Sequence, residues 1–355
     1  MPARTKRPAA VVLEGLGGYV PAGTVTNLDL EGRLETSDAW IRSRTGIHSR
    51  RFAAPGEATS DMAAEAASRA LASAGYPEID LVILATTTPD HPCPATAPAV
   101  ASRLGLGPVA AFDLAAVCSG FVYALAQANA AVLSGQHRRV LVIGADTFSA
   151  IVNPLDRNTA IIFGDGAGAV VVGAGEEGQP GQLSAFDLHS DGSCTDLIRV
   201  AAGGSRMPVN AETSDADRYF SMQGKEVFVQ AVTAMAESSR SVLQESGWQH
   251  GDVDWLIAHQ ANQRILNQVA GLLGIDPRKA VIHLDRVGNT SAASIPLALA
   301  DHAPRFETGD KLLLTAFGGG TTWGAGTLTW PPIAVADPQQ AVNERTKPWP
   351  TPQPS

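Results

Sequence analysis

The stretch "SRALASAGYPEIDLVILA" at residues 68–85 decides the fold, because the chain uses its pattern twice. It consists of the end of a helix, a glycine at Gly75 where a left-handed residue stops a helix, and an apolar strand. The same order recurs in "RSVLQESGWQHGDVDWLIA" at residues 240–258, with Gly247 in the place of Gly75. Apolar strands that alternate with helices are typical of parallel sheets buried on both faces.

The similarity continues along the chain at an offset of about 171–174 residues, which indicates an internal repeat. "FDLAAVCSG" (112–120) matches "HLDRVGNTS" (283–291), and "RRVLVIGAD" (138–146) matches "DKLLLTAFG" (310–318). We therefore expect an α/β fold built from two copies of one unit.

The repeat also predicts where the copies begin and end. We assign residues 1–178 to the first copy and 179–332 to the second, joined through the turn-rich "GAGEEGQPGQ" at 173–182. The polar insertion at 189–222 in the second copy predicts a surface loop that covers a site. Residues 333–355 are rich in proline and predict a disordered tail.

The composition excludes several classes of protein. The net charge of −9 argues against nucleic acid or an anionic membrane as a partner, because a polyanion is bound by dense Lys and Arg. We see no signal peptide and no apolar run near the ~18 residues of a membrane span, so we expect a cytoplasmic protein. Three cysteines without metal-ligand spacing predict neither a metal site nor a disulfide framework; they are Cys93, Cys118 and Cys194.

The duplication predicts a site where the two copies meet. If they pack about a pseudo-twofold axis, equivalent strand-to-helix turns come together at the centre. Cys118 lies in that turn of the first copy, and we take Asn289 as its equivalent in the second. His259 ends an apolar strand, and the carboxyl ends of such strands are where ligands bind.

Each of these residues has an ordinary structural explanation when it is considered alone. A buried cysteine is usually a small apolar residue, a histidine at a strand end is usually structural, and asparagine after glycine usually caps a turn. Together they predict catalysis. A helix N-terminus and a nearby imidazole favour the thiolate, so we expect Cys118 to be a nucleophile near neutral pH. A carboxamide such as Asn289 can donate a hydrogen bond to a developing enolate.

Five motifs extend this prediction to a known family. They resemble β-ketoacyl-acyl carrier protein synthase III, the initiating condensing enzymes of the thiolase fold, from about Val11 to Trp330. The resemblance implies a thiolase-like, five-layer αβαβα sandwich and a homodimer. The motifs, in order, are "DLAAVCSGF", "FGDGAGAVVV", "HQANQRI", "GNTSAAS" and "FGGGTTWG".

The resemblance also implies the chemistry. Cys118 attacks an acyl-CoA primer while backbone N–H groups of Cys118 and Gly319 hold the oxyanion. His259 and Asn289 then polarise a malonyl thioester as carbon dioxide leaves, and the resulting carbanion attacks the acyl group. No cofactor is needed beyond the coenzyme A thioesters.

Binding of coenzyme A is implied by "SDAWIRSRTGI" (37–47) and its counterparts. Trp40 and Arg157 would hold the adenine between an indole and a guanidinium. The remaining residues that the resemblance assigns to coenzyme A and its pantetheine arm are Arg44, Phe163, Asn262 and Arg264.

Two departures from the family pattern bear on the substrates. Cys93 replaces a bulky aromatic residue that, in relatives, reaches from the partner subunit to close the acyl pocket. This predicts a primer larger than acetyl. Gly271 and Leu272 replace two basic residues that grip the carrier protein, although Lys225 and Arg264 remain. The extender is therefore either malonyl-acyl carrier protein or malonyl-CoA.

Three other functions remain open. A non-condensing acyltransferase of the same fold can lose the asparagine, which is present here as Asn289. A non-catalytic partner subunit would be expected to lack Cys118. A thiolase or hydroxymethylglutaryl-type synthase would need a second catalytic Cys or a Glu that we cannot place.

Overall fold

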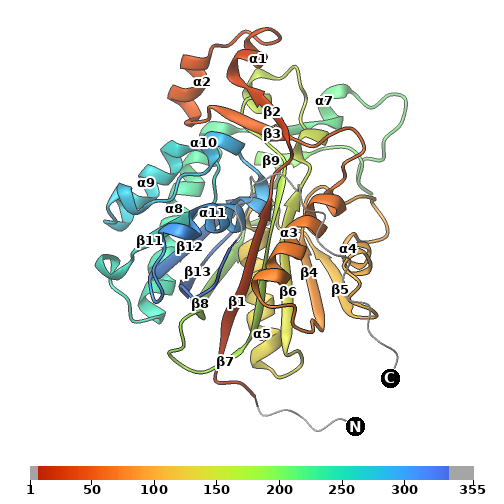
Figure 1. The fold of residues 1–355 in the computed structure, drawn as a ribbon. Coiled ribbons are helices and arrows are strands. Elements are labelled where there is room, and N and C mark those ends of the chain that lie inside the picture. The colour runs from red at the N-terminus through yellow and green to blue at the C-terminus, as the bar shows by residue number, and fades with distance from the viewer. Residues whose placement is uncertain (1–6, 336–355) are drawn as a thin grey trace.

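One nine-stranded sheet within the described residues, 7–335, carries both copies of the repeat (Figure 1). The structure is a computed structural model. The strands follow the order β11-β12-β13-β8-β1-β7-β6-β4-β5. The first copy supplies β1 (Ala10–Tyr19), β4 (Leu81–Ala85), β5 (Ala110–Leu114), β6 (Arg139–Asp146) and β7 (Gly166–Gly175), and the second supplies β8 (Gln182–Ser190), β11 (Trp255–Ala258), β12 (Lys311–Gly318) and β13 (Thr322–Thr329).

The strand order shows the duplication directly. β1 and β8 lie side by side at the centre and pair antiparallel, with Val11 opposite Leu183. Outward from β1 come β7, β6 and β4; outward from β8 come β13, β12 and β11. In both copies the second strand is antiparallel to its neighbours, and the outer pair is parallel. The prediction of two copies of one α/β unit is confirmed.

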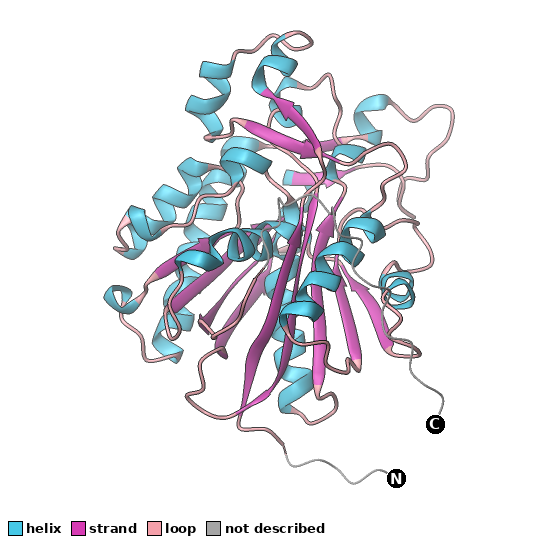
Figure 2. Cartoon of the chain, viewed as in Figure 1, coloured by secondary structure: helices cyan, strands magenta, loops and turns pink. Residues whose placement is uncertain are grey.

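The helices complete a five-layer α/β/α/β/α sandwich, as expected (Figure 2). Two central helices lie between the two halves of the sheet, and one of them, α5, contacts strands of both halves. The outer layers cover the opposite faces, one for each copy. The central helices are α5 (Gly120–Leu133) and α11 (Ser294–His302), the outer layer of the first copy is α3 (Thr59–Ser73) with α4 (Ala97–Arg103), and that of the second is α8 (Gly224–Glu245) with α9 (Gln263–Leu273).

Small residues determine how closely α3 approaches the sheet. Its alanines form a fully buried face, and β1 presents glycines to it. A Cβ at Gly17 would lie 2.4 Å from Ala66 O, so the helix packs directly on the strand backbone. The predicted stops after α3 and α8 are also present, because Gly75 and Gly247 have positive φ values of 75° and 67°.

A cap of shorter elements covers one end of the sheet (Figure 1). The insertion at 189–222, predicted as a loop, contains a two-stranded sheet because its apolar residues Val200 and Phe220 pack into a core with Phe148 and Phe163. The cap comprises β2 (Gly23–Thr26), α1 (Asn27–Glu31), α2 (Asp38–Thr45), β3 (Ser49–Phe52), α6 (Arg157–Ala160), β9 (Ile198–Val200), α7 (Asp215–Arg218), β10 (Phe220–Met222) and α10 (Leu284–Val287).

The last described residues test the predicted disordered tail. Ile333 packs against the main core and Ser73 Oγ donates to Ala334 O at 2.6 Å, so the predicted disordered tail does not begin at 333. The rest of that prediction, from 336 on, lies outside the described residues.

No helix between residues 7 and 335 has both the length and the apolar composition that a membrane span requires.

Candidate active site

Cys118 lies in a short 3₁₀ turn, η1 (Val117–Ser119), that leads from β5 into α5. Its side chain is buried, and its Sγ donates to Ser291 Oγ at 3.7 Å. The residue before it, Val117, has a φ of 47°. A β-branched residue rarely adopts this conformation, so the backbone is strained directly before the cysteine.

Two hydrogen bonds with backbone groups hold Asn289 in place. Its Oδ1 accepts from Ser291 N at 2.8 Å, and its own N–H donates to Ile162 O at 2.9 Å. The side chain is only 4% exposed. Within residues 7–335, Nδ2 donates to no acceptor, which leaves this amide available to donate to a ligand.

His259 follows β11 and extends its ladder, with its N–H donating to Thr315 O at 2.8 Å. Its Nδ1 lies 2.6 Å from Ser294 Oγ, and that oxygen also accepts from Gln260 N at 3.4 Å. Ser294 Oγ can donate its one hydrogen to Nδ1 while it accepts from Gln260 N, and in that arrangement the ring proton of His259 lies on Nε2.

The turn at residues 289–294 therefore brings the three predicted side chains together. It contains Asn289, it contacts Cys118 through Ser291, and it contacts His259 through Ser294. The sequence signalled neither serine's role, although "GNTSAAS" places them three residues apart at the start of α11.

The equivalence drawn between Cys118 and Asn289 is wrong by three residues. η1 leads into α5 as the 3₁₀ turn η6 (Ser291–Ala293) leads into α11, and the first residue of each turn has a positive φ, 47° at Val117 and 52° at Ser291. Cys118 is thus the counterpart of Ala292. Asn289 reaches the site from just before the equivalent turn.

Burial favours the uncharged forms of Cys118 and His259. It raises the pKa of the Cys118 thiol to about 12, and the Asp146 carboxylate adds to this rise while the hydrogen bond to Ser291 opposes it. Burial therefore opposes the thiolate, which the helix N-terminus and a nearby imidazole were expected to favour. Burial also lowers the pKa of His259 to about 3, so its imidazole is neutral.

The glycine-rich end of β12 lies against Cys118. A Cβ at Gly318 would lie 2.8 Å from Cys118 N and 3.0 Å from Ser119 N, so the strand approaches η1 at backbone distance. Gly319 follows, and its carbonyl accepts from Thr322 Oγ1 at 3.0 Å. A side chain on either glycine would disturb this contact.

A cavity of about 660 Å³ adjoins the site. It touches η1 at Val117 and is walled by the β9–β10 insertion, as predicted for a segment that covers a site. The insertion contributes mostly apolar residues, which are Ile198, Val200, Ala202 and Phe220. Cys93 is exposed, in the loop after β4.

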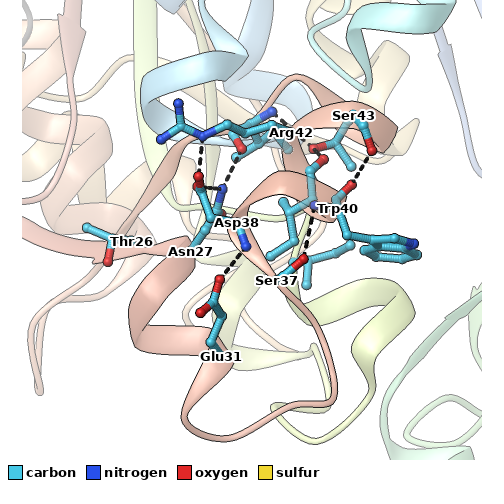
Figure 3. Close-up of polar contacts among 12 residues, drawn as sticks. Thr26, Asn27, Glu31, Ser37, Asp38, Trp40, Arg42 and Ser43 are labelled. Carbon is cyan, nitrogen blue, oxygen red and sulfur yellow. Dashed lines mark hydrogen bonds and ion pairs between the residues drawn. The ribbon is translucent and has the colours of Figure 1, made fainter.

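The residues assigned to the adenine of coenzyme A meet at the rim of the cap. The Arg157 guanidinium lies 4.9 Å from the centre of the Trp40 ring, and that of Arg44 lies 5.9 Å from it. Figure 3 shows Ser37 capping α2 by accepting from Trp40 N, with the indole pointing away from Arg42. A planar ring between the two groups needs about 7 Å, so Arg157 must move to admit one.

The other three predicted contact residues have structural partners. Asn262 caps α9 by accepting from Arg264 N, and its Nδ2 donates to Arg44 O at 3.0 Å, so it ties α9 to α2. Arg264 is exposed and lies over the Phe228 ring at 5.5 Å. Phe163 is buried, stacks on Phe148 and forms a backbone bridge with Asn289.

Sequence reasoning missed one further residue. Asp146, the last residue of β6, is fully buried and accepts from Ala292 N in the 289–294 turn. No cluster of three or more His, Cys, Asp or Glu residues between 7 and 335 is arranged to hold a metal ion.

Comparisons with known proteins agree with the geometry. The family profile for 3-oxoacyl-[acyl-carrier-protein] synthase III matches residues 112–192, and the profile for its C-terminal part matches residues 243–330. β-Ketoacyl-[acyl-carrier-protein] synthase III 3 of Streptomyces coelicolor is 58% identical over 91% of this chain and 98% of its own. The Pseudomonas aeruginosa enzyme is 49% identical over 92% of this chain and 98% of its own.

Solved structures give the same answer. The crystal structure of 3-oxoacyl-(acyl carrier protein) synthase III from P. aeruginosa PAO1 superposes with a TM-score of 0.86 at 48% identity, covering 92% of this chain and 99% of that one. The priming β-ketosynthase of the R1128 polyketide pathway superposes with a TM-score of 0.86 at 32% identity, covering 93% and 99%. This chain belongs to the β-ketoacyl-acyl carrier protein synthase III family.

Proposed function

We propose that this chain condenses an acyl-CoA primer with a malonyl thioester, with loss of carbon dioxide, through an acyl thioester on Cys118. The observation that supports the proposal is the 289–294 turn, which contains Asn289 and is hydrogen-bonded to Cys118 through Ser291 and to His259 through Ser294. This set combines a nucleophile with two uncharged hydrogen-bond donors, as a two-step acyl transfer and condensation requires.

In the first half-reaction, Cys118 Sγ attacks the thioester carbonyl and the thiolate of coenzyme A leaves. The backbone N–H groups of Cys118 and Gly319 are the proposed oxyanion donors. The contact of Gly318 with Cys118 N supports this role, because it brings the end of β12 to the nucleophile.

In the second half-reaction, His259 Nε2–H and Asn289 Nδ2–H donate to the malonyl carbonyl as its carboxylate departs. Both groups are neutral, so they stabilise the enolate without supplying a proton that would quench it. The enolate carbon then attacks the acyl group on Cys118 and releases the Cys118 thiolate, which takes up one proton from solvent.

The primer is larger than acetyl in this proposal. The cavity beside Val117 is about 660 Å³, and Cys93, proposed to reach the partner's pocket, fills less volume than an aromatic residue. The R1128 enzyme, named as a priming β-ketosynthase, shows that a relative of this fold serves a polyketide pathway.

The coenzyme A moiety binds at the rim of the cap, with its adenine between Trp40 and Arg157. A guanidinium already stacked on an indole supports this assignment, since both present flat faces to a planar base.

The proposed assembly is a homodimer joined through β5. This strand ends the sheet, Ala110 is exposed on it, and Phe112 is 42% exposed. An exposed edge strand is a template for pairing with another chain, and a second copy pairing there would cover this apolar side chain.

The malonyl donor docks beside Arg264 and Lys225, which remain exposed near the start of α9 and α8. Gly271 and the half-exposed Leu272 offer no charge to an acidic carrier protein. The proposed carrier contact is therefore weaker than a four-cation surface would provide, and coenzyme A is an alternative donor.

Intact-protein mass spectrometry tests the proposal. Wild-type protein and a Cys118→Ala control are incubated with acyl-CoA thioesters of increasing length and branching, then with malonyl-CoA or malonyl-acyl carrier protein. We expect a mass increase equal to the acyl group on wild type alone, and its loss as the β-ketoacyl product forms. Acylation without condensation would instead indicate a non-condensing acyltransferase, and no acylation would overturn the proposal.

A further inference from the structure

Arg50 is a buried cation of the cap for which the proposed reaction has no role. The residue lies on β3 and is 0% exposed. Its Nη2 donates to Ile161 O at 2.7 Å and to Asn27 Oδ1 at 2.9 Å, and its Nη1 donates to Val25 O at 3.2 Å. All three acceptors are uncharged, and the guanidinium makes no ion pair within the part of the chain that the structure describes. Burying a charge without a counter-ion is costly, so this arrangement calls for an explanation.

Asn27 extends the contact from Arg50 to α2. Its side chain is 1% exposed, and its Nδ2 donates to Asp38 Oδ1 and to Ile47 O, both at 2.9 Å. Figure 3 shows Asp38, the first residue of α2, between Asn27 and Arg42. The amide uses its oxygen and both of its hydrogens, and the reverse orientation would place its NH₂ group against the guanidinium. The Asn27 side chain therefore has one orientation.

These hydrogen bonds end on the two helices that present the proposed adenine contacts. Ile161 directly follows α6, the helix that begins with Arg157. Asn27 is bonded to the start of α2, which carries Trp40 in its first turn. One guanidinium thus connects the helix of Trp40 to the helix of Arg157. A planar fork of five N–H donors suits this task, because it can reach acceptors in several segments at once.

The direct contact between the two helices is more exposed. Arg157 Nη1 donates to Glu35 O at 2.9 Å in the loop before α2, at the surface of the cap. Arg157 has to move to admit a planar ring beside Trp40, and water can replace Glu35 O as its acceptor at little cost. The buried hydrogen bonds of Arg50 need not change during this movement. They can hold α2 and α6 at a fixed spacing while the Arg157 side chain opens and closes.

We propose that Arg50 and Asn27 are positioning residues for coenzyme A. Together they fix α2 relative to α6, so that Trp40 and Arg157 receive the adenine with movement of the Arg157 side chain alone. The inference rests on the proposed function and deepens it, because it assigns the residues that preorganise the nucleotide site. Preorganisation raises affinity by removing an ordering cost from the binding step. The pair should therefore govern the binding of acyl-CoA and leave the chemistry at Cys118 unchanged.

The test compares two thioesters that carry the same acyl group. Acyl-CoA contains the nucleotide, whereas the acyl thioester of N-acetylcysteamine reproduces only the cysteamine end of the pantetheine arm. Acylation of Cys118 by each is followed against donor concentration by intact-protein mass spectrometry. Asn27→Ala removes the link to α2, and Arg50→Lys keeps the charge while it replaces the planar fork by a compact ammonium. Asp38→Ala removes the acceptor on α2 at a position that is only partly buried.

All three variants should need about 10-fold or more acyl-CoA for half-maximal acylation, with a maximal rate within about twofold of wild type. The dissociation constant of free coenzyme A, measured by isothermal titration calorimetry, should rise by a similar factor. Acylation by the N-acetylcysteamine thioester should stay within about twofold of wild type. Asn129→Ala is the matched control, because it shortens an asparagine of α5 whose Oδ1 has no hydrogen bond within residues 7–335; it should match wild type with both donors.

The inference is overturned if the variants need no more acyl-CoA than wild type. It is also overturned if they lose the two donors equally, since a general disturbance of the fold would have that effect. Should the variants at Asn27 and Arg50 fail to fold, Asp38→Ala decides the matter. Failure of the proposed function would appear separately, as wild type that takes an acyl group from neither donor. A Trp40→Ala variant that binds coenzyme A as tightly as wild type would refute the adenine site, and this inference with it.

Discussion

At the residue scale, uncharged hydrogen-bond donors suit the loss of carbon dioxide better than charged donors would. An imidazolium near the malonyl carboxylate would form an ion pair with the group that has to leave. Burial prevents this, because it lowers the pKa of His259 to about 3 and keeps the ring uncharged.

The protonation state of His259 predicts a flat pH dependence for condensation. The ring takes up a proton only as the pH falls toward about 3. Single-turnover condensation of protein already acylated on Cys118, with malonyl-CoA in excess, should therefore keep its rate within about twofold between about pH 5 and pH 8. A fall in rate centred near the ordinary imidazole pKa of about 6.5 would contradict this.

Ser294 should matter for the tautomer of His259. Ser294→Ala removes the hydroxyl that is hydrogen-bonded to Nδ1, so this contact no longer helps to fix the tautomer of the ring. We expect condensation to slow about 10- to 100-fold, and to slow more than acylation does, in separate single-turnover measurements. Ser239→Ala, which removes a buried hydroxyl of α8 that has no hydrogen bond within residues 7–335, is the matched control. An equal loss in both half-reactions would show that Ser294 serves only to hold the fold.

The sequence predicted which side chains lie near one turn but not how burial shifts their pKa values. A helix N-terminus contributes about 0.3–1 kcal/mol toward a thiolate. Burial moves the thiol pKa from an ordinary 9.0 to about 12, which corresponds to about 4 kcal/mol in the other direction. Local sequence shows the helix start at Cys118, whereas burial depends on packing by both copies of the repeat.

At the element scale, the contact between α3 and β1 supports the outer layer of the first copy. The alanine face of the helix includes Ala66 and Ala70, which are fully buried, and Gly17 of β1 leaves room for both. Close packing of this kind leaves no volume for an added methyl group.

Substitution of Gly17 by alanine should therefore destabilise the protein. The new Cβ would lie 2.4 Å from both Ala66 O and Ala70 N, which are backbone atoms that cannot turn aside. We expect a lower thermal midpoint and a loss of about 1–3 kcal/mol in the free energy of unfolding. Gly251→Ala, at a position with no neighbour within 4 Å, should leave the midpoint unchanged. Equal midpoints for the two variants would contradict the packing argument.

Strands and helix ends were predictable because they depend on short patterns. The apolar run at 81–85 and the glycine stops at Gly75 and Gly247 are visible in the sequence itself. The small sheet within 189–222 was not, because its apolar residues are separated by polar stretches and become a strand pair only against the cap core. The exact register of the two turns also depends on where each helix starts, which sequence similarity fixed only to within three residues.

The whole molecule is proposed to work as a pair, and this predicts the effect of a change on β5. Phe112→Asp places a charge on the exposed edge, so we expect dissociation to a monomer in light scattering coupled to size-exclusion chromatography. Leu272→Asp replaces another half-exposed apolar residue, on α9 and away from that edge, and should leave the mass unchanged. A Phe112→Asp variant with wild-type mass would place the interface elsewhere.

The size of primer that the enzyme prefers should depend on residue 93 if the loop that contains Cys93 reaches the partner's cavity. Cys93→Phe adds volume there, so the ratio of acylation rates should move toward acetyl-CoA by about 10-fold or more. Cys93→Ala keeps a small side chain and should retain the preference of wild type. If wild type and both variants prefer the same primers, Cys93 does not contribute to the acyl pocket.

At the scale of the whole molecule, the contacts that the sequence did not predict are those between segments far apart in the chain. Asp146 meets Thr87, Thr88 and the 289–294 turn only after both copies have docked. The repeat predicted the docking of the copies, and the resemblance supplied Trp40 and Arg157, which lie 117 positions apart and stack at the cap rim. A single carboxylate with no motif of its own gave no signal.

The β9–β10 insertion forms one wall of the cavity beside Val117, and it is separate from the 289–294 turn. Val200 and Ala202 line the cavity, whereas the hydroxyls bonded to Cys118 and His259 belong to Ser291 and Ser294 in the 289–294 turn. If the cavity holds the primer chain as proposed, substitutions at these two positions can change the preferred chain length without touching that turn.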